Sequence, residues 1–266
     1  HYTFWRGYLS PELLVMGAFG VLALSTYRLL RERSAVALLG VVVGGLGVGL
    51  IKPYVLFPYI LAVAAWIYAD RAWKAGEVVK IRPAYLVFAL LFAAGGIAVM
   101  GSLFPQFGVN KVAETVANQQ ALWQQTDGGS NMDLGSEDAR TLASQLPFLP
   151  IALINALFRP ALFEARNAPM LGAALETTAI AVGVVSVIWR YSWRATQRVI
   201  FRSPLLVYSV VFVLTFSVAV GLATSNLGSL SRYRVPMMPF YVTALLVLAR
   251  RLREERRMSV TRQGAA

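Results

Sequence analysis

Two arginines near the carboxy-terminal end of the chain, Arg232 and Arg234 in the stretch SRYRVPMMPF, have the side chains best suited to binding a phosphate. A guanidinium group is planar and presents paired N–H donors that match phosphate oxygens. Both arginines directly precede an apolar run, and a charge at such a boundary is costly unless it reaches phosphate or water. The pattern therefore predicts either a phosphate-binding pair or two side chains that extend to lipid head groups.

Two further ionisable residues interrupt apolar sequence. Lys52, in LIKPYVLFPY, separates two short apolar runs, so it is either a second phosphate or pyrophosphate contact in a cavity or a side chain that extends to the surface from a tight hairpin. Glu176 lies several residues inside a run that starts at Pro169, where an ionised carboxylate costs about 3 kcal/mol unless it is paired or hydrated. We expect Glu176 to be functional, with pairing to Arg159 or Arg166 as the alternative.

Other carboxylates lie in one long polar stretch, and any two could serve as a general base and a metal ligand. Their spacing selects no pair, although Glu164 stands nearest to the following apolar run. The chain has no cysteine and its sole histidine is His1, which makes a Cys- or His-based metal site improbable. No cofactor is firmly implied, and the question of a divalent metal stays open. The acidic residues of this stretch are Glu114, Asp127, Asp133, Glu137, Asp138 and Glu164.

The elements that position these residues are predicted by composition. Of 266 residues, 57% are hydrophobic and 14% are charged, whereas a soluble domain carries about 25% charged residues. The apolar residues come in long runs, and a helix needs about 20 of them to cross a bilayer. We predict an all-α, polytopic transmembrane helix bundle, a single membrane domain over 1–266, with about seven spans near residues 13–30, 35–51, 54–69, 84–103, 169–189, 205–223 and 235–248.

Two features of this partition depend on proline. The apolar sequence from 35 to 69 is too long for one span, and we divide it at Lys52-Pro53 because proline disfavours helix in the residue before it. Residues 104–168 form one large extracytoplasmic loop, which includes a proline-broken apolar segment, 146–163, that we expect to lie at the membrane interface.

The predicted topology divides the residues behind the net charge of +12 between the two sides of the membrane. With the amino terminus outside, 17 of the 25 Lys and Arg fall on the inner side, including four arginines from Arg190 to Arg202 that recur every four residues and are predicted to share one helical face. Positive residues accumulate in cytoplasmic loops, so the basic loops and the carboxy terminus are predicted to be cytoplasmic. We infer no nucleic-acid partner, and the start at His1 suggests an amino-terminally truncated fragment.

The sequence between about 120 and 245 resembles bacterial multi-spanning proteins of surface-polysaccharide assembly. Three pieces carry the resemblance: TDGGSNMD, ALFRPALFEARNAPMLGAALE and SNLGSLSRYRVPMMPF. The last is similar to the arginine-rich helix entry of GT-C type glycosyltransferases, which use lipid-linked sugars. The resemblance implies that Arg232 and Arg234 contact the carrier phosphate and that Glu164 and Glu176 lie near the transfer site. GT-C enzymes usually carry their catalytic acid in a first outer loop, and this chain contains no such loop.

The leading hypothesis is a glycosyltransferase-like or polymerase-like step in exopolysaccharide or cell-envelope glycan assembly. The substrate would be a polyprenyl-phosphate-linked sugar at the extracytoplasmic face of a bacterial inner membrane, with membrane lipids as the other partner. One alternative is a transporter or flippase of lipid-linked glycans, and another is a non-catalytic membrane subunit.

Overall fold

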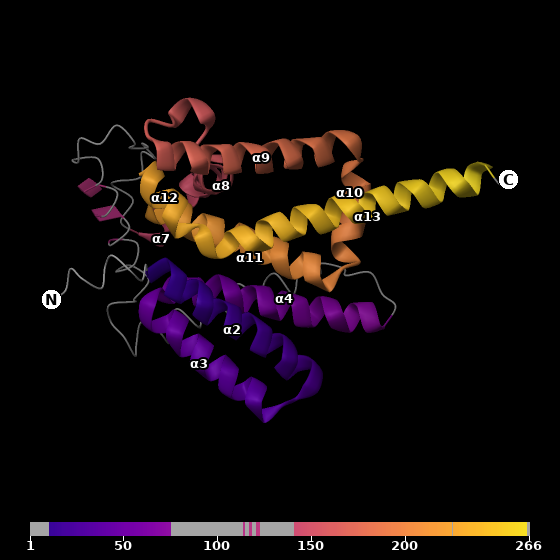
Figure 1. Cartoon of the computed structure of the whole chain (residues 1–266), viewed down its shortest axis with the longest axis horizontal. Helices are drawn as coiled ribbons and strands as arrows, with labels where there is room; N and C mark the ends of the chain where they lie inside the picture. The colour runs from indigo at the N-terminus through magenta and orange to yellow at the C-terminus, as the bar shows by residue number, and fades with distance from the viewer. Residues whose placement is uncertain are drawn as a thin grey trace.

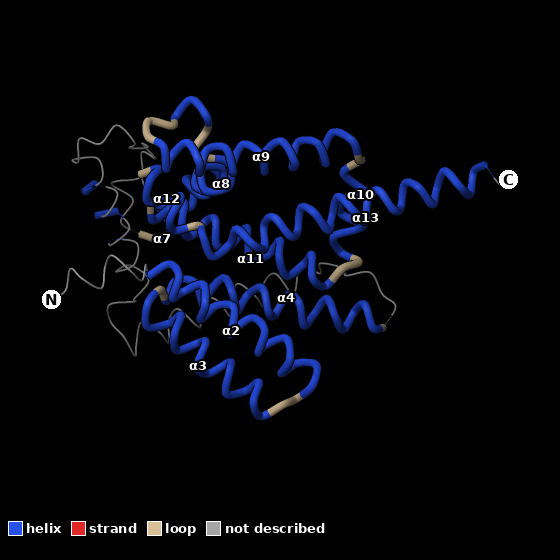
Figure 2. Tube along the Cα trace, viewed as in Figure 1, coloured by secondary structure: helices blue, strands red, loops and turns tan. Residues whose placement is uncertain are grey.

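A computed structural model describes residues 11–75, 141–224 and 226–264, together with five isolated positions between 114 and 122. Every regular element in these ranges is a helix (Figure 2), as the predicted all-α class requires. The long helices run lengthwise beside one another and are joined at two ends (Figure 1). The predicted span 84–103 and, apart from these five positions, residues 104–140 of the predicted loop 104–168 lie outside the described residues.

The amino-terminal part is three helices, α2 (Pro11–Glu32), α3 (Ala35–Ile51) and α4 (Leu56–Lys74). Glycines allow α2 and α3 to pack closely. A Cβ atom on Gly44 would lie 2.7 Å from the backbone nitrogen of Leu22, and one on Gly40 would meet the side chain of Ser25. Small residues are used in this way where helix backbones approach each other in membranes.

The break between α3 and α4 falls at Lys52-Pro53, the point at which the apolar run was divided. α3 ends at Ile51, and residues Pro53–Val55 form a short 3-10 helix, η1, before α4 starts. Pro53 has no N–H to donate and disfavours helix in the residue before it. Lys52 accordingly has φ −141° and ψ 74°, outside the helical region.

The carboxy-terminal part is centred on α11, which packs against α4, α8 and α13. It carries ten buried residues, more than the helices around it show. Its elements are α9 (Ala168–Arg190), α10 (Trp193–Phe201), α11 (Pro204–Ala223), α12 (Leu227–Tyr233), the 3-10 helix η5 (Val235–Met237) and α13 (Met238–Gly264).

An aromatic cluster joins the two parts. The ring of Phe212 on α11 lies 5.3 Å from that of Phe19 on α2 and 5.0 Å from that of Phe240 on α13, measured between centroids. Tyr59 of α4 meets Phe19 edge-on at 5.5 Å. Such pairs contribute about 1 kcal/mol each beyond the area they bury, so this cluster stabilises the packing of four helices.

One sequence-based prediction about α9 and α10 is wrong. The four arginines from Arg190 to Arg202 do not share one helical face, because the helix ends at Arg190 and a new one starts at Trp193. The Ser192 hydroxyl accepts a hydrogen bond from the Ala195 amide and caps the new helix. A four-residue spacing predicts a common face only where the helix is continuous.

The proline-broken segment 146–163 forms short helices that pack on the bundle: α7 (Leu142–Gln145), η3 (Leu146–Phe148), α8 (Leu149–Phe158) and η4 (Leu162–Glu164). α8 is seen nearly end-on beside the first turns of α9 in Figure 1. It lies so close to α11 that a Cβ atom on Gly221 would clash with the carbonyl oxygen of Ala152. Its ten residues reach about 15 Å, which is too short to cross a bilayer.

Five helices in the described ranges are long and apolar enough to cross a membrane: Glu12–Glu32, Pro53–Lys74, Ala168–Arg190, Pro204–Ala223 and Val235–Met258. α3 is apolar but has 17 residues, a length of about 25 Å, slightly less than the hydrocarbon core of about 30 Å. The described chain therefore has the helices of a multi-pass membrane protein.

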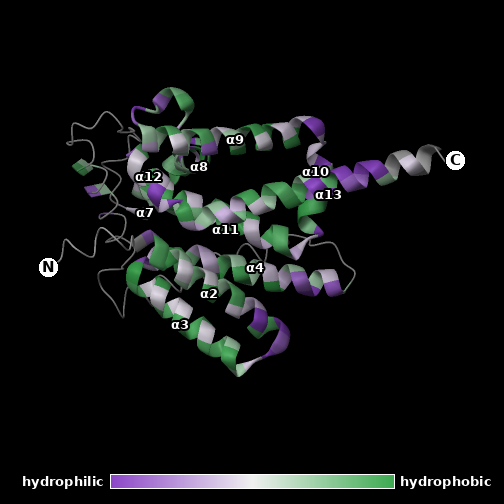
Figure 3. Ribbon diagram, viewed as in Figure 1, coloured by the Kyte–Doolittle hydropathy of each residue, from purple (hydrophilic) through white to green (hydrophobic). Residues whose placement is uncertain are grey.

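The two ends of the bundle differ in charge. The basic end, formed by residues 28–34, 70–74 and 190–203, carries exposed arginines, and Asp70 there pairs with Arg31 at 3.2 Å and with Lys74 at 2.7 Å. The opposite end, here called the α12 end, is formed by residues 51–56, 159–168 and 224–238. In Figure 3, hydrophobic residues predominate along the helices between the two ends.

Candidate functional site

Four of the five residues singled out from the sequence lie at the α12 end, and the fifth, Glu176, lies further along α9. Lys52 precedes η1, Glu164 ends η4, Arg232 lies in α12 and Arg234 follows it. Glu176 lies eight residues after Ala168, the first residue of α9, which is about 12 Å along the helix axis. The fold therefore brings side chains from both halves of the chain to one end.

Arg234 is buried, with 2% of its surface exposed. Its guanidinium donates to the carbonyl oxygen of Arg159 at 2.7 Å, to the Thr177 hydroxyl at 2.6 Å and to the Ala173 carbonyl oxygen at 3.4 Å. These bonds tie the start of α13 to α9 and to the turn after α8. The phosphate role predicted for Arg234 stays a prediction, and its donors in this structure are turned toward the protein.

Burial lowers the pKa of Arg234 from its ordinary value, and the negative charge of Glu176 opposes that shift. An arginine keeps its proton in proteins even so. No described carboxylate lies within ion-pair distance of this guanidinium. A buried positive charge thus lies close to the exposed carboxylate of Glu176 without a direct ion pair.

Arg232 has the opposite environment. It lies in the last turn of α12 and is exposed, without a hydrogen bond or ion pair to any residue that the structure describes. Asn226 starts this helix by accepting hydrogen bonds from the amides of Gly228 and Ser229 at 2.9 and 3.1 Å. Arg232 is therefore a free guanidinium on a well-anchored short helix.

Lys52 is also buried, with 8% exposed. Its ammonium lies 3.4 Å from a carboxylate oxygen of Glu12 on α2 and 5.3 Å from the centroid of the Tyr233 ring. A cation over an aromatic face gains roughly 0.5 to 2 kcal/mol. The three residues of the RYR motif thus have separate roles: Arg232 faces solvent, Tyr233 covers Lys52, and Arg234 points into the protein.

Glu164 is paired with Arg159. The Nε atom of Arg159 donates to one carboxylate oxygen at 2.8 Å, with Nη2 also in contact, and the amide of Ala161 donates to the other oxygen at 2.8 Å. Burial would raise the pKa of Glu164, but the hydrogen bonds from Arg159 and Ala161 and the charge of Arg159 lower it overall. Glu164 thus holds the turn between α8 and α9, and the catalytic role predicted for it remains a prediction.

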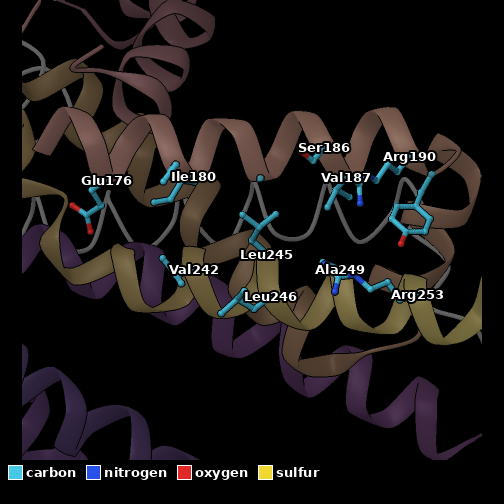
Figure 4. A pocket seen from close by; sticks show the side chains of 13 residues that line it. Glu176, Ile180, Ser186, Val187, Arg190, Val242, Leu245, Leu246, Ala249 and Arg253 are labelled. Atoms are coloured by element: carbon cyan, nitrogen blue, oxygen red, sulfur yellow. The ribbon is translucent and has the colours of Figure 1, made fainter. Parts of the chain in front are cut away.

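Glu176 lies at one end of a groove of about 540 Å³ between α9 and α13 (Figure 4). The middle of the groove is apolar, formed by Ile180, Val242, Leu245 and others, and its far end is lined by Arg190 and Arg253. The alternative pairing of Glu176 with Arg159 or Arg166 is not among the ion pairs of the described residues.

No group of three His, Asp or Glu side chains that could hold a metal ion occurs within residues 11–75, 141–224 and 226–264. The acidic stretch between 126 and 138 lies outside the described residues. The hypothesis that two carboxylates of the long predicted loop act together therefore stays a prediction.

Several residues that shape this end could not be found from sequence patterns. Thr177 and Glu12 are partners of Arg234 and Lys52, at separations of 57 and 40 residues. Nothing in a single sequence pairs residues so far apart. Arg159 and Glu164, five residues apart, form a local pair that spacing could have suggested.

Comparison of the chain with protein-family models, with curated proteins and with solved structures finds no match.

Proposed function

We propose that this chain is the membrane part of a glycosyltransferase-like or polymerase-like protein. It would act on a polyprenyl-phosphate-linked sugar at the extracytoplasmic face of a bacterial inner membrane. The observation that supports this most is the arrangement at the α12 end. An exposed guanidinium, Arg232, stands on a short anchored helix, and an exposed carboxylate, Glu176, borders an apolar groove toward the same end of the bundle.

The chemistry requires a cation for the phosphate and a base for the acceptor. The acceptor hydroxyl attacks the anomeric carbon, its proton passes to a carboxylate, and the sugar–phosphate bond breaks to release polyprenyl phosphate. Arg232 is free to bind the phosphate bidentately, and Glu176, exposed beside the groove, is the better-placed base. Glu164 already has both oxygens bonded within the protein.

Buried groups at this end would act as supports. Arg234 fixes the entry to α13 through Thr177 and the Arg159 carbonyl, and its charge would favour an anion nearby. Lys52 fixes α12 through Tyr233. In this proposal Arg234 and Lys52 position Arg232 and add positive electrostatic potential. Either side chain would have to leave its present partners to contact the phosphate directly.

The orientation belongs to the proposal as well. The basic end would face the cytoplasm, since positively charged loops are retained on that side. The α12 end would then face the extracytoplasmic side, where lipid-linked sugars are consumed in the resemblance drawn from the sequence.

The test is reconstitution of the full chain in vesicles with a radiolabelled polyprenyl-phosphate sugar. Transfer of label to an acceptor or into polymer supports the proposal, and the Arg232→Ala and Glu176→Gln variants should each lower the rate at least tenfold. Arg166→Ala, which removes another exposed arginine at the same end, is the matched control. Label that crosses the bilayer without transfer identifies a flippase. If the label is neither transferred nor moved across the bilayer, the chain is a non-catalytic subunit. Each of these two outcomes overturns the proposal.

A further inference from the structure

The groove between α9 and α13 has two chemically different ends. Glu176 borders it toward the α12 end, and Arg190 and Arg253 border it at the basic end (Figure 4). The stretch from Glu176 to Arg190 covers 14 residues of α9, or about 21 Å. One groove thus extends through most of the depth of a bilayer core.

The two arginines at the basic end are unpaired with carboxylates. The ion pairs formed by described residues of this region join Arg202 to Glu255 and Arg250 to Glu254, and include neither Arg190 nor Arg253. Both are exposed and come from different helices, and Figure 4 shows them on the two sides of the groove. Two guanidinium groups on opposite sides of one groove can hold an anion between them, and the paired N–H donors of a guanidinium match phosphate oxygens.

The rest of the groove is suited to a hydrocarbon chain. Between the arginines and Glu176 it is lined by Val187, Leu245, Leu246 and Ala249, and Leu245 packs against Gly183, where a Cβ atom would lie 2.7 Å from its Cδ2 atom. One leaflet of hydrocarbon is about 15 Å deep, so a chain anchored at the arginines fits within the groove length. Both arginines lie at the end of the groove away from Glu176, which fixes the direction of the occupant.

We propose that this groove binds an anionic phospholipid, with its phosphate between Arg190 and Arg253 and one acyl chain along α9 and α13. Charge complementarity selects this occupant over a zwitterionic lipid, whose choline group would face the same two arginines. The phosphate of this lipid would lie at the end of the groove away from Glu176 and Arg232, so it would not occupy the phosphate site of the proposed transfer reaction. The lipid would add to the contacts between α9 and α13, which share an apolar cluster that includes Val187, Leu245 and Ala249.

The experiment is native mass spectrometry of the full chain in micelles that contain equal amounts of phosphatidylglycerol and phosphatidylcholine. Wild-type protein should retain phosphatidylglycerol preferentially. The Arg190→Gln/Arg253→Gln double variant should lose that preference by about 30-fold, since two arginines near an anionic lipid surface together contribute about 2 kcal/mol. Arg198→Gln/Arg251→Gln is the matched control, because it removes two exposed charges near the same end that do not line the groove.

Two further arms fix the interpretation. Ser186→Phe fills the groove from α9 without a change in charge, and it should also weaken retention of phosphatidylglycerol. Added glycerophosphoglycerol, the same head group without acyl chains, should not displace the lipid. The proposal is overturned if the wild type shows no preference, if both double variants lose it equally, or if the chain-free head group competes as well as the lipid.

Discussion

The buried guanidinium of Arg234 gives the sharpest prediction about the α12 end. It makes two short hydrogen bonds, to the Arg159 carbonyl oxygen and to the Thr177 hydroxyl, and one long bond to the Ala173 carbonyl oxygen. We expect Arg234→Met, which keeps much of the side-chain length and removes the charge, to destabilise the protein. Thr177→Ala, which removes one acceptor, should do so less.

The magnitude follows from the bonds. A hydrogen bond to a charged group contributes roughly 1.5 to 3 kcal/mol, so the two short bonds together amount to about 3 to 6 kcal/mol. Removal of the charge also removes its cost of burial, and we expect a net loss of about 2 to 3 kcal/mol for Arg234→Met. Thr177→Ala loses one bond and should cost about 1 to 2 kcal/mol.

The assay is equilibrium unfolding in detergent micelles, with a double-mutant cycle over the two sites. If the bond between the side chains exists as described, the double variant should be more stable than the sum of the single effects predicts, by about 1 kcal/mol or more. Additive effects, or an Arg234→Met protein as stable as the wild type, would refute the role assigned to this arginine.

Three other perturbations have defined outcomes. Gly44→Val places a side chain against the backbone of α2 and should cost about 2 kcal/mol or more in thermal unfolding, whereas Gly17→Val, where a Cβ meets nothing, should have little effect. The lowered pKa of Glu164 means that its pairing with Arg159 stabilises the protein above the ordinary carboxyl pKa of 4.5 and that this contribution is lost as pH falls through the lowered value. The stability difference between wild type and Glu164→Gln should therefore be constant near neutral pH and shrink in acid; a difference independent of pH would contradict the pairing. Lys52→Met removes the ion pair between Lys52 and Glu12 and should weaken the protein by roughly 1 kcal/mol, measured by chemical unfolding.

The sequence predicted the helices of the described part well, because span length and proline are local properties. The predicted spans 169–189 and 205–223 correspond to helices Ala168–Arg190 and Pro204–Ala223. The last helix differs, since it continues from the predicted end near 248 to Gly264. Hydropathy marks where apolar residues stop, whereas the helix continues through charged residues that favour it, including the Arg250–Glu254 pair at four-residue spacing.

The site was predicted only in part. The sequence predicts the direction of each span. It therefore predicts that Lys52, Glu176 and the RYR motif lie toward the same end of the bundle. Which arginine is buried and which is free could not be predicted, because Arg232 and Arg234 are two residues apart and differ by the face of a short helix turn. That choice depends on where Thr177 and the Arg159 carbonyl lie, which packing alone determines.

The most direct measurement of the central claim is the affinity of the reconstituted full chain for polyprenyl phosphate, which needs no knowledge of the sugar. Removal of a bidentate phosphate contact costs roughly 1.5 to 3 kcal/mol, so Arg232→Ala should bind the carrier phosphate about 10- to 100-fold more weakly. Arg166→Ala should bind as the wild type does. Equal affinity in the wild type and Arg232→Ala, or no binding by the wild type, would contradict the proposal that the α12 end recognises a lipid-linked phosphate.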